Sequence, residues 1–375
     1  MTSLADKAAS DIEARKQLGI PPEIASSAFG PLLLKAVQET ETKRKLTVPW
    51  KLDEPYNQPY FVFDITEQVW QPREPAQSSA EGSQDQQSNE VPSGPVKGLA
   101  LYSWNIDMML PFPEARTSAA IDHIEVLTKE LPSTTAIAIF IQECTIPHFE
   151  AITKSEWIRN NFSVTDIDSS NWTSGHFGTT ILIDRRLPIT SCFRVHFAQT
   201  FVDRDAHFVD VSMGPAGARS ASTIRLCNVH LESFDWETPL RPAQMGIISK
   251  YIHEDGVNGG IVAGDFNSLQ PYDKTLHTEH NLKDAFLEIG GQEDSEAGFT
   301  WGLQSPPVMM ADGPSRLDKI MFHGDCFGLR CFEIFGRDVE LADESQKAEL
   351  IRVGCQKPWI TDHLGVMAEL HLTGA

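Results

Sequence analysis

Short apolar runs separated by turn residues most constrain what this 375-residue chain folds into. Eight such runs follow residue 96, and each has the length of one strand. They lie at residues 99–102, 136–141, 180–183, 208–211, 224–229, 260–263, 319–322 and 366–370. Helical spacing of apolar residues over 120–131, and after Pro242 over 242–252, predicts helices between some of them. Short strands with interleaved helices predict a layered α/β domain with mixed sheets.

The composition is that of a globular protein, with 41% hydrophobic and 22% charged residues. No apolar run approaches the roughly 20 residues that cross a bilayer, so we expect no membrane partner. The first residues carry no basic region followed by an apolar stretch, so no secretory signal is expected. The six cysteines are dispersed without a C-x-x-C pair, which disfavours a disulfide framework and a zinc knuckle. We therefore expect a protein of the nucleus, the cytoplasm or both.

The formal net charge of −21 argues against one class of function. Most of the acidic excess follows residue 96. A chain without a net positive field does not coat duplex nucleic acid by releasing counterions. A local basic groove, or a cation bound among carboxylates, stays open.

The chain divides by composition into three parts. Residues 74–95 are dominated by Ser, Gln, Glu, Pro and Gly, which predicts a flexible linker. Before it, helix-like stretches at 4–18 and 31–46 and one possible strand at 59–64 indicate a partly ordered N-terminal appendage over residues 1–73. A small helical module that binds a protein partner is the alternative for that segment. Residues 96–375 form the main domain.

Polar residues cluster where six of the apolar runs begin or end. Ligand sites of layered α/β folds gather at strand ends, so these clusters predict one site. Each residue alone has a common structural explanation, such as a solvated carboxylate, a core histidine or a tight turn. The clusters are Asn105 with Asp107, Gln142 with Glu143, His230 with Glu232 and Ser233, Asp265 with Asn267, Arg316 with Asp318, and Asp362 with His363.

The order of these motifs resembles that of a known family. W-N, Q-E, H-L-E-S, G-D-x-N, R-x-D-x-I and D-H-x-G follow one another as in the endonuclease/exonuclease/phosphatase superfamily, the DNase I-like metal-dependent phosphodiesterases. W-N-I-D, H-L-E-S and a T-W before R-x-D are most similar to its tyrosyl-DNA phosphodiesterase 2 subfamily. The resemblance covers about residues 97–372. It implies a four-layer sandwich of two mixed β-sheets flanked by helices.

Three departures from that subfamily concern the substrate. Gly-Leu-Asp usually follows W-N-I-D, where this chain has residues Met-Met-Leu at 108–110. Leu-Arg-Asp usually follows G-D-x-N, where this chain has Ser-Leu-Gln at 268–270, so an arginine that contacts substrate is missing. Leu364 stands where the subfamily has Trp. None of these changes removes a group from the core chemistry.

The resemblance also implies a cation. A phosphodiester resists hydrolysis because the attacking oxygen must approach an anion, and one hard cation offsets that charge. Magnesium, with manganese as the alternative, takes oxygen ligands and keeps several waters. The implied ligands are Glu143 first, with Asn105 and Asp362 assisting directly or through water.

Five residues receive catalytic roles from the resemblance. Asp265 would orient and deprotonate the attacking water. Asn267 and His230 would donate to phosphate oxygens. His363 would be protonated to stabilise developing charge, and Asp318 would orient it.

Two further residues are expected to bind substrate, and three assignments keep alternatives. Trp301 would form a wall of the substrate site, although core packing explains it equally. Arg241 would contact substrate, although an ordinary surface charge explains it nearly as well. Asp318 has the alternative of an ion pair with Arg316 or Lys319.

These residues predict a magnesium-dependent phosphodiesterase that hydrolyses the 5′-phosphotyrosyl bond at DNA ends, as in repair of topoisomerase adducts. The expected partner is a single-stranded 5′ terminus that carries a tyrosyl adduct. One alternative is an enzyme of the same superfamily that acts on RNA ends, abasic DNA or a small phosphoester. A domain that only binds phosphate is disfavoured, because no position needed for catalysis is missing.

Overall fold

The computed structural model describes residues 35, 38, 42–43, 47–75, 96–200, 202–214, 221–233, 239–305 and 313–373. Nearly all of the expected linker at 74–95 lies outside these residues. The helical stretch expected at 4–18, most of that at 31–46, and any partner site on them lie outside as well. Within the described part of the chain, no helix is long and apolar enough to cross a bilayer.

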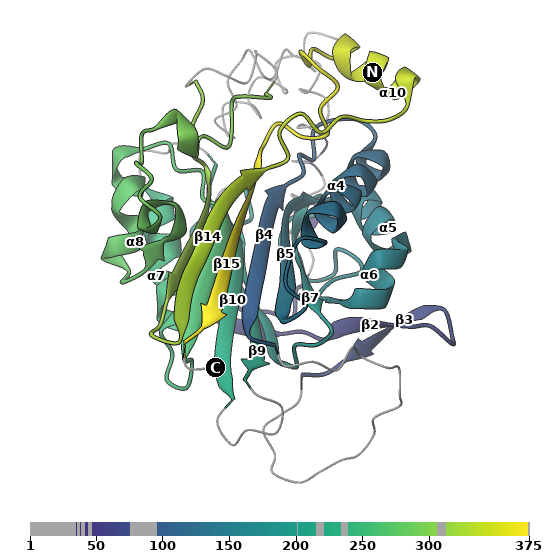
Figure 1. Ribbon diagram of the computed structural model, residues 1–375. Helices are drawn as coiled ribbons and strands as arrows, with labels where there is room; N and C mark the ends of the chain where they lie inside the picture. Colours follow the sequence, from purple (N-terminus) through teal and green to yellow (C-terminus); the bar gives the residue numbers. More distant parts are fainter. Residues whose placement is uncertain are drawn as a thin grey trace.

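Two mixed β-sheets pack face to face at the centre of the molecule (Figure 1). One sheet has seven strands in the order β1-β8-β9-β10-β11-β13-β12, and the other has eight in the order β14-β15-β4-β5-β7-β6-β2-β3. The strands of the first are β1 (Pro55–Asn57), β8 (Ile189–His196), β9 (Asp205–Met213), β10 (Ser222–His230), β11 (Gly259–Asp265), β12 (Lys283–Asp284) and β13 (Asp318–His323). Those of the second are β2 (Tyr60–Asp64), β3 (Val69–Arg73), β4 (Gly98–Asn105), β5 (Thr135–Cys144), β6 (Phe162–Val164), β7 (Gly178–Asp184), β14 (Phe327–Phe335) and β15 (Gly365–Leu372).

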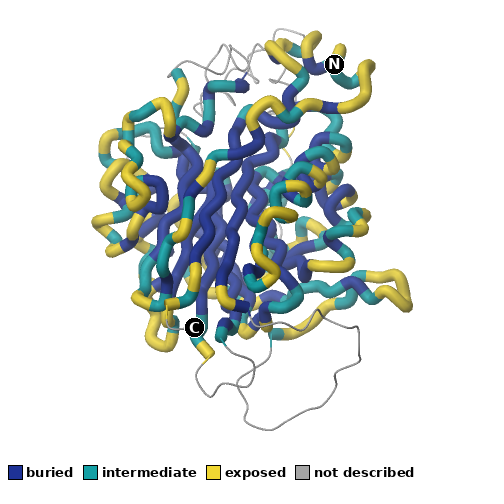
Figure 2. Tube along the Cα trace, viewed as in Figure 1, coloured by how far each residue is buried: buried dark blue, intermediate teal, exposed yellow. Residues whose placement is uncertain are grey.

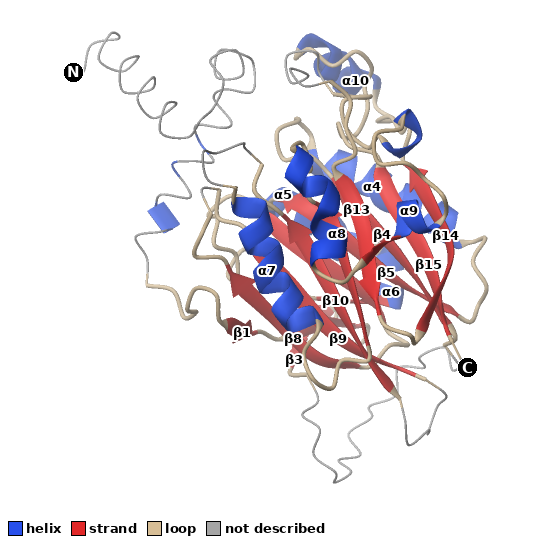
Figure 3. Ribbon diagram, turned by 90° about the vertical axis from the view of Figure 1, so that its left-hand side faces the viewer, coloured by secondary structure: helices blue, strands red, loops and turns tan. Residues whose placement is uncertain are grey.

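Helices cover the outer face of each sheet, which gives four layers (Figures 1 and 3). The seven-stranded sheet carries α7 (Leu240–Ile252) and α8 (Leu276–Glu279). The eight-stranded sheet carries α4 (Pro113–Thr128), α5 (Ile146–Lys154) and α6 (Glu156–Asn161). Further helices are η1 (Pro271–Thr275), α9 (Ala285–Glu288), η2 (Glu296–Gly298) and α10 (Glu344–Arg352). The predicted four-layer sandwich is confirmed.

Burial on both faces explains why the strands appear in the sequence as continuous apolar runs. In β4, Leu99 and Leu101 belong to the core between the two sheets. Ala100 and Tyr102, which alternate with them, pack toward α4 and α5. Figure 2 shows the result as a dark blue centre within a mostly teal and yellow shell.

All eight runs lie within strands, and the predicted helices correspond to α4 and α7. Strands β8 and β14 escaped prediction because polar residues interrupt their apolar pattern. The guanidinium of Arg194 in β8 is buried in a network of ion pairs, and Glu333 in β14 is exposed.

The expected boundary between appendage and domain is wrong for residues 50–73. Strand β1 pairs with β8 of the seven-stranded sheet, and β2 pairs with β6 of the eight-stranded sheet. Trp50 is buried and its ring stacks on His196 at 4.1 Å between centroids. Because these strands complete the two sheets, they belong to the folded domain, although the sequence separates them from it by the predicted linker.

Candidate active site

Six strand ends meet at one edge of the sandwich. Strands β4 and β5 run parallel, as do β10 and β11, so their carboxyl ends lie together. Strands β13 and β15 run antiparallel to β11 and β4, so they begin at that same edge. Gly264 lets β11 approach β10 closely, because a Cβ there would lie 1.9 Å from the carbonyl oxygen of Val229. The topology thus brings the sequence motifs together.

Asp265, at the end of β11, lies at the centre of the site. Its Oδ2 accepts a hydrogen bond from Nδ2 of Asn105 at 3.0 Å and lies 3.3 Å from Nε2 of His230. Nε2 of His363 lies 3.8 Å from the same oxygen. Burial by itself raises the pKa of Asp265, but His230, His363 and hydrogen bonds outweigh it and lower that pKa. Asp265 is therefore an ionised carboxylate, which accepts hydrogen bonds.

His363 and Asp318 form a second buried contact. Nδ1 of His363 lies 2.8 Å from Oδ2 of Asp318, whose side chain is buried. Burial lowers the pKa of His363, but the carboxylates of Asp318, Asp362 and Asp265 outweigh it and raise that pKa well above the ordinary value. His363 is therefore an imidazolium. No other described side chain lies within hydrogen-bond distance of its Nε2, which can donate to a substrate oxygen.

The expected alternative for Asp318 is not what the structure shows. Lys319 pairs with Glu293, and Arg316 pairs with Asp284 and Glu293. Asp318 is thus free of both cations and contacts His363 instead.

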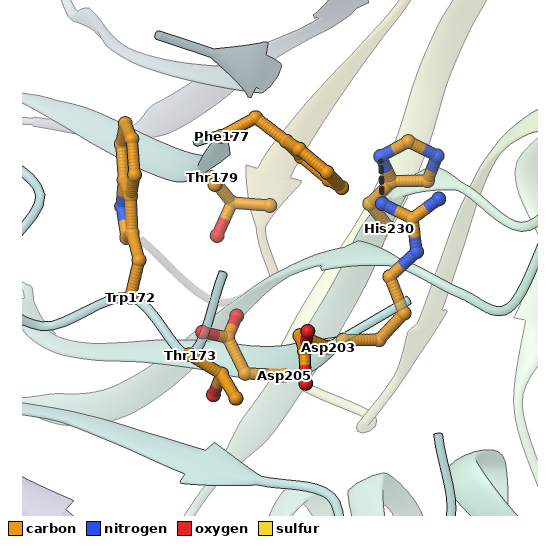
Figure 4. Close-up of a pocket in the computed structure, with 9 residues that line it drawn as sticks. Trp172, Thr173, Phe177, Thr179, Asp203, Asp205 and His230 are labelled. Atoms are coloured by element: carbon orange, nitrogen blue, oxygen red, sulfur yellow. Dashed lines mark hydrogen bonds between the residues drawn. The ribbon is translucent and has the colours of Figure 1, made fainter. Parts of the chain in front are cut away.

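His230 differs from His363 in its charge. Burial, followed by the charge of Arg204, lowers the pKa of His230 well below its ordinary value. Its Nδ1 lies 2.9 Å from Nη1 of Arg204, the contact dashed in Figure 4. The site therefore holds one neutral and one protonated imidazole, both near Asp265.

Three carboxylates beside these residues form an acidic cluster of Asp107, Glu143 and Asp362. Burial raises the pKa of Glu143, and the charge of Asp362 adds to it. Burial and then Asp107 raise the pKa of Asp362 to about 6. Burial also raises that of Asp107, although Arg116 opposes it. Oxygen donors whose charges repel one another fit a hard divalent cation.

A second group of ligand atoms is less suited to a cation. One ligand atom from each of Asp265, Asp318 and His363 lies within 4.8 Å of the others. The hydrogen bond between Asp318 and His363 already occupies one oxygen of Asp318. Because the imidazolium has no lone pair to offer, this group suits proton chemistry.

The two asparagines of the site are held by hydrogen bonds. Oδ1 of Asn105 accepts from the backbone N–H of Asp107 at 3.0 Å, which leaves one lone pair for a cation. Nδ2 of Asn267 donates to the carbonyl oxygen of Leu231 at 3.0 Å, which leaves one N–H for a phosphate oxygen. Each asparagine therefore has one polar atom available: Asn105 could contact a cation, and Asn267 could contact a phosphate oxygen.

Strained backbone accompanies the acidic cluster. Asp107, Glu143 and Asn267 have φ values of 52°, 59° and 48°, in the left-handed region that non-glycine residues rarely occupy. The N–H of Met108 donates to Oε2 of Glu143 at 2.8 Å and so couples two of these strand ends.

The two expected substrate residues have different surroundings. Nε1 of the half-buried Trp301 donates to Oδ2 of Asp362 at 2.8 Å, so Trp301 lies at the site and orients a carboxylate. Arg241 is 1% exposed and donates to both carboxylate oxygens of Asp273, at 2.9 and 2.7 Å. The substrate-contact prediction for Arg241 is wrong in this structure, because its guanidinium is buried in an ion pair.

Sequence reasoning gave no role to three residues that shape the site. Asp107 was named among the polar residues at the strand ends and belongs to W-N-I-D, so its place in that motif was a usable signal. Arg116 in α4 donates to the carbonyl oxygens of Ile106 and Asp107 and holds that loop. Arg204 precedes β9 in a segment without a motif, so only the folded structure reveals it.

A small cavity of about 10 Å³ adjoins His230, with room for about one water. Phe177 points from its wall toward His230 (Figure 4). The cavity is too small for a tyrosyl group, so it does not provide a pocket for that leaving group.

Comparison with known proteins agrees with this arrangement. The model of the Endonuclease/Exonuclease/phosphatase family matches residues 102–363. The chain belongs to that family. Its members are hydrolytic phosphoesterases, and the matched segment runs from β4 to His363. A search of curated protein sequences finds no match.

Solved structures share the fold at low identity. Truncated Caenorhabditis elegans TDP2 is 19% identical, with a TM-score of 0.52 over 73% of this chain and 97% of that one. D. rerio TDP2 complexed with single strand DNA product is 17% identical, with a TM-score of 0.54 over 73% and 99%. The human Nocturnin catalytic domain with bound sulfate is 15% identical, with a TM-score of 0.50 over 74% and 94%. At these identities the likeness establishes the DNase I-like fold.

Proposed function

We propose that this protein is a magnesium-dependent phosphodiesterase that hydrolyses the 5′-phosphotyrosyl bond at single-stranded DNA ends. The observation that carries the proposal is the surroundings of Asp265 Oδ2. Asn105, His230 and His363, from three separate strand ends, all approach that one oxygen. A carboxylate between a neutral and a protonated imidazole suits attack by water on an anionic ester.

Asp265 acts on the nucleophile. Hydrogen bonds from Asn105 and from the backbone of Asn267 fix its carboxylate. As an ionised acceptor it orients a water molecule and takes its proton during attack. Because Asp265 is buried, bulk solvent does not compete for its carboxylate, and the attacking water is held in one orientation.

His363, His230 and Asn267 act on the phosphoryl oxygens. Nε2 of the His363 imidazolium donates to an oxygen as negative charge develops there. His230 offers an N–H without adding charge, and Asn267 offers its remaining amide hydrogen. Asp318 keeps the His363 ring in place through Nδ1.

The acidic cluster supports the choice of cation. Glu143 and Asp362, with Asn105 and Asp107 beside them, would hold magnesium, or manganese in its place. When bound, the cation neutralises phosphate charge and polarises the ester. The repulsion among the three carboxylates is the reason to expect affinity for a divalent ion.

The choice of DNA substrate rests on the motifs and on the structural neighbours. W-N-I-D and H-L-E-S resemble the tyrosyl-DNA phosphodiesterase 2 subfamily, and D. rerio TDP2 was crystallised with a single strand DNA product. A single-stranded end needs few contacts, which suits a chain of charge −21. The missing arginine at 268–270 and the burial of Arg241 predict weaker binding than in that subfamily.

A second candidate is an esterase of the same family that acts on RNA ends, abasic DNA or a small phosphoester. The human Nocturnin catalytic domain, with bound sulfate, has nearly the same structural similarity to this chain. The lack of an available arginine at the two expected positions favours a smaller substrate over a long duplex.

One assay separates these candidates. Purified protein with magnesium is incubated with 5′-tyrosyl, 3′-tyrosyl, abasic, unmodified DNA and RNA oligonucleotides and with small phosphoesters. We expect 5′-tyrosyl DNA to be cleaved fastest and to leave a 5′-phosphate. His363→Ala is the control for a contaminating enzyme. Preference for any other substrate would overturn the DNA proposal and keep the phosphoesterase.

A further inference from the structure

Arg204 contacts the catalytic edge from outside the motifs. Its Nη1 lies 2.9 Å from Nδ1 of His230. A guanidinium has only donors, so in this contact the arginine donates and Nδ1 of His230 accepts. The single proton of the neutral ring must then be on Nε2, which faces Oδ2 of Asp265 at 3.3 Å.

Neighbouring groups hold Arg204 in this position. Its Nη2 donates to Oγ of Ser233, and its Cζ lies over the ring of Phe177 at 5.1 Å from the centroid. Its backbone N–H donates to Oγ1 of Thr200 at 2.9 Å, and that hydroxyl donates to Oε2 of Glu232 at 3.1 Å. A side chain 5% exposed with these contacts has little freedom to leave His230.

These contacts also link Arg204 to the H-L-E-S motif. Arg204 contacts the side chains of His230 and Ser233, and Thr200 connects its backbone to Glu232. The side chains of this motif therefore bind one arginine, which lies 26 residues before His230 in the sequence.

We infer that Arg204 is a positioning residue that fixes the tautomer of His230, with the proton on Nε2 directed at Asp265 and the scissile phosphate. The effect of this tautomer on catalysis rests on the proposed phosphodiesterase function, whereas the assignment of the tautomer does not. Without Arg204, Nδ1 would lose its donor, and the ring could carry its proton on either nitrogen. A ring with its proton on Nδ1 has a lone pair on Nε2, which repels both Asp265 and a phosphate oxygen.

A simpler role for Arg204 is to balance the charge of Glu232, Glu143 and Asp265. Burial lowers the pKa of Arg204, and these three carboxylates oppose that shift. Charge balance and tautomer control predict different results. Loss of charge alone changes rate or stability without moving the proton of His230 between its nitrogens.

Nitrogen-15 spectra of the histidine rings test the inference in the full chain with magnesium present. The spectra report which ring nitrogen carries the proton, and the His230 signals are assigned by their loss in His230→Gln. We expect the native protein to show a proton on Nε2 only. Arg204→Met should show protonated Nδ1 as well, and kcat should fall about 10²-fold, as on loss of one aimed donor.

Two variants serve as matched controls. Lysine, like arginine, can only donate hydrogen bonds, so Arg204→Lys should keep the Nε2–H tautomer of His230 and part of the activity. Arg225→Met removes another buried arginine of β10, which pairs with Asp210 of β9 and with Glu254 and not with His230, and it should leave the His230 signals unchanged. Circular dichroism checks that each variant is folded.

Two results would overturn the inference. A proton on Nδ1 in the native protein would do so without any variant, even if Arg204→Met failed to fold. An unchanged tautomer in folded Arg204→Met would leave only charge balance. Because the spectra need no substrate, an inactive protein on every tested ester would refute the proposed function and leave this inference standing.

Discussion

Nδ1 of His363 donates a hydrogen bond to Oδ2 of Asp318 across 2.8 Å, and Asp318 itself is fully buried. The burial raises the pKa of Asp318 to about 6, even though the nearby His363 acts to lower it. The two side chains are thus joined by one hydrogen bond. Because Asp318 is buried, its carboxylate cannot touch a substrate. Its effect on catalysis must pass through the orientation and charge of the imidazole.

Replacing Asp318 by Asn tests that dependence. Asparagine keeps the shape but removes the charge that favours the imidazolium, and it can hold the wrong tautomer. We expect kcat to fall by on the order of 10²–10⁴-fold with little change in KM. Steady-state kinetics measures both, and Asp294→Asn, at an exposed carboxylate paired with Lys274, is the control. A change confined to KM would show that Asp318 acts on binding instead.

Glu143→Gln should separate cation binding from folding. The variant removes the charge of one of three carboxylates that repel one another, so the cation-free protein should be at least as stable as the native one. Turnover should be lost. Magnesium should raise the melting temperature of the native protein and do so much less for the variant, because a ligand stabilises only the state that binds it. Full activity of the native protein in a chelator would contradict the cation dependence.

The sequence predicts which polar residues lie together, because each of them stands at the end of a strand. Asn105, Glu143, His230 and Asp265 each follow a buried apolar run, and parallel pairing of β4 with β5 and of β10 with β11 places such ends together. Continuous apolar runs identified those strands. The motif order then indicated which ends meet.

Contacts that depend on distant segments could not be predicted in this way. From the sequence alone, Arg241 resembles an ordinary surface charge, because its ion-pair partner Asp273 lies 32 residues later in the chain. Arg204 lies in a segment without a pattern, and its partner is known only after β9 and β10 pair. Strands β1 to β3 precede a polar stretch and are too short to reveal their pairing with β8 and β6. In each case the decisive partner lies on another element.

Truncation tests the revised domain boundary. A chain that begins at Thr47 should keep the stability of the domain, because it retains β1, β2 and Trp50. A chain that begins at Val96 should unfold at lower temperature or aggregate, because edges of both sheets and the stacked His196 are uncovered. Thermal unfolding of the two chains measures the difference. Equal melting temperatures would restore the view of residues 50–73 as an appendage.

The ion pair of Arg241 with Asp273 should contribute to stability and not to substrate affinity. Arg241→Met leaves a buried carboxylate without its cation, which typically costs about 3–5 kcal/mol of unfolding free energy. Adding Asp273→Asn should recover part of that loss. Urea unfolding gives the free energies, and kinetics at a temperature where the variant is folded gives KM. A raised KM with unchanged stability would return Arg241 to the substrate site.

Buried neutral histidines should make the fold sensitive to mild acid. Burial, and then Arg194, lowers the pKa of His207 well below its ordinary value. The unfolded chain takes up a proton on this ring below about pH 6.5 while the folded chain does not, so stability falls as pH falls through that window. Each such ring contributes a slope of about 1.4 kcal/mol per pH unit. His207→Gln should reduce the slope by about that amount. Urea unfolding at a series of pH values measures it, and equal slopes for the native protein and His207→Gln would mean that the folded state protonates His207 after all.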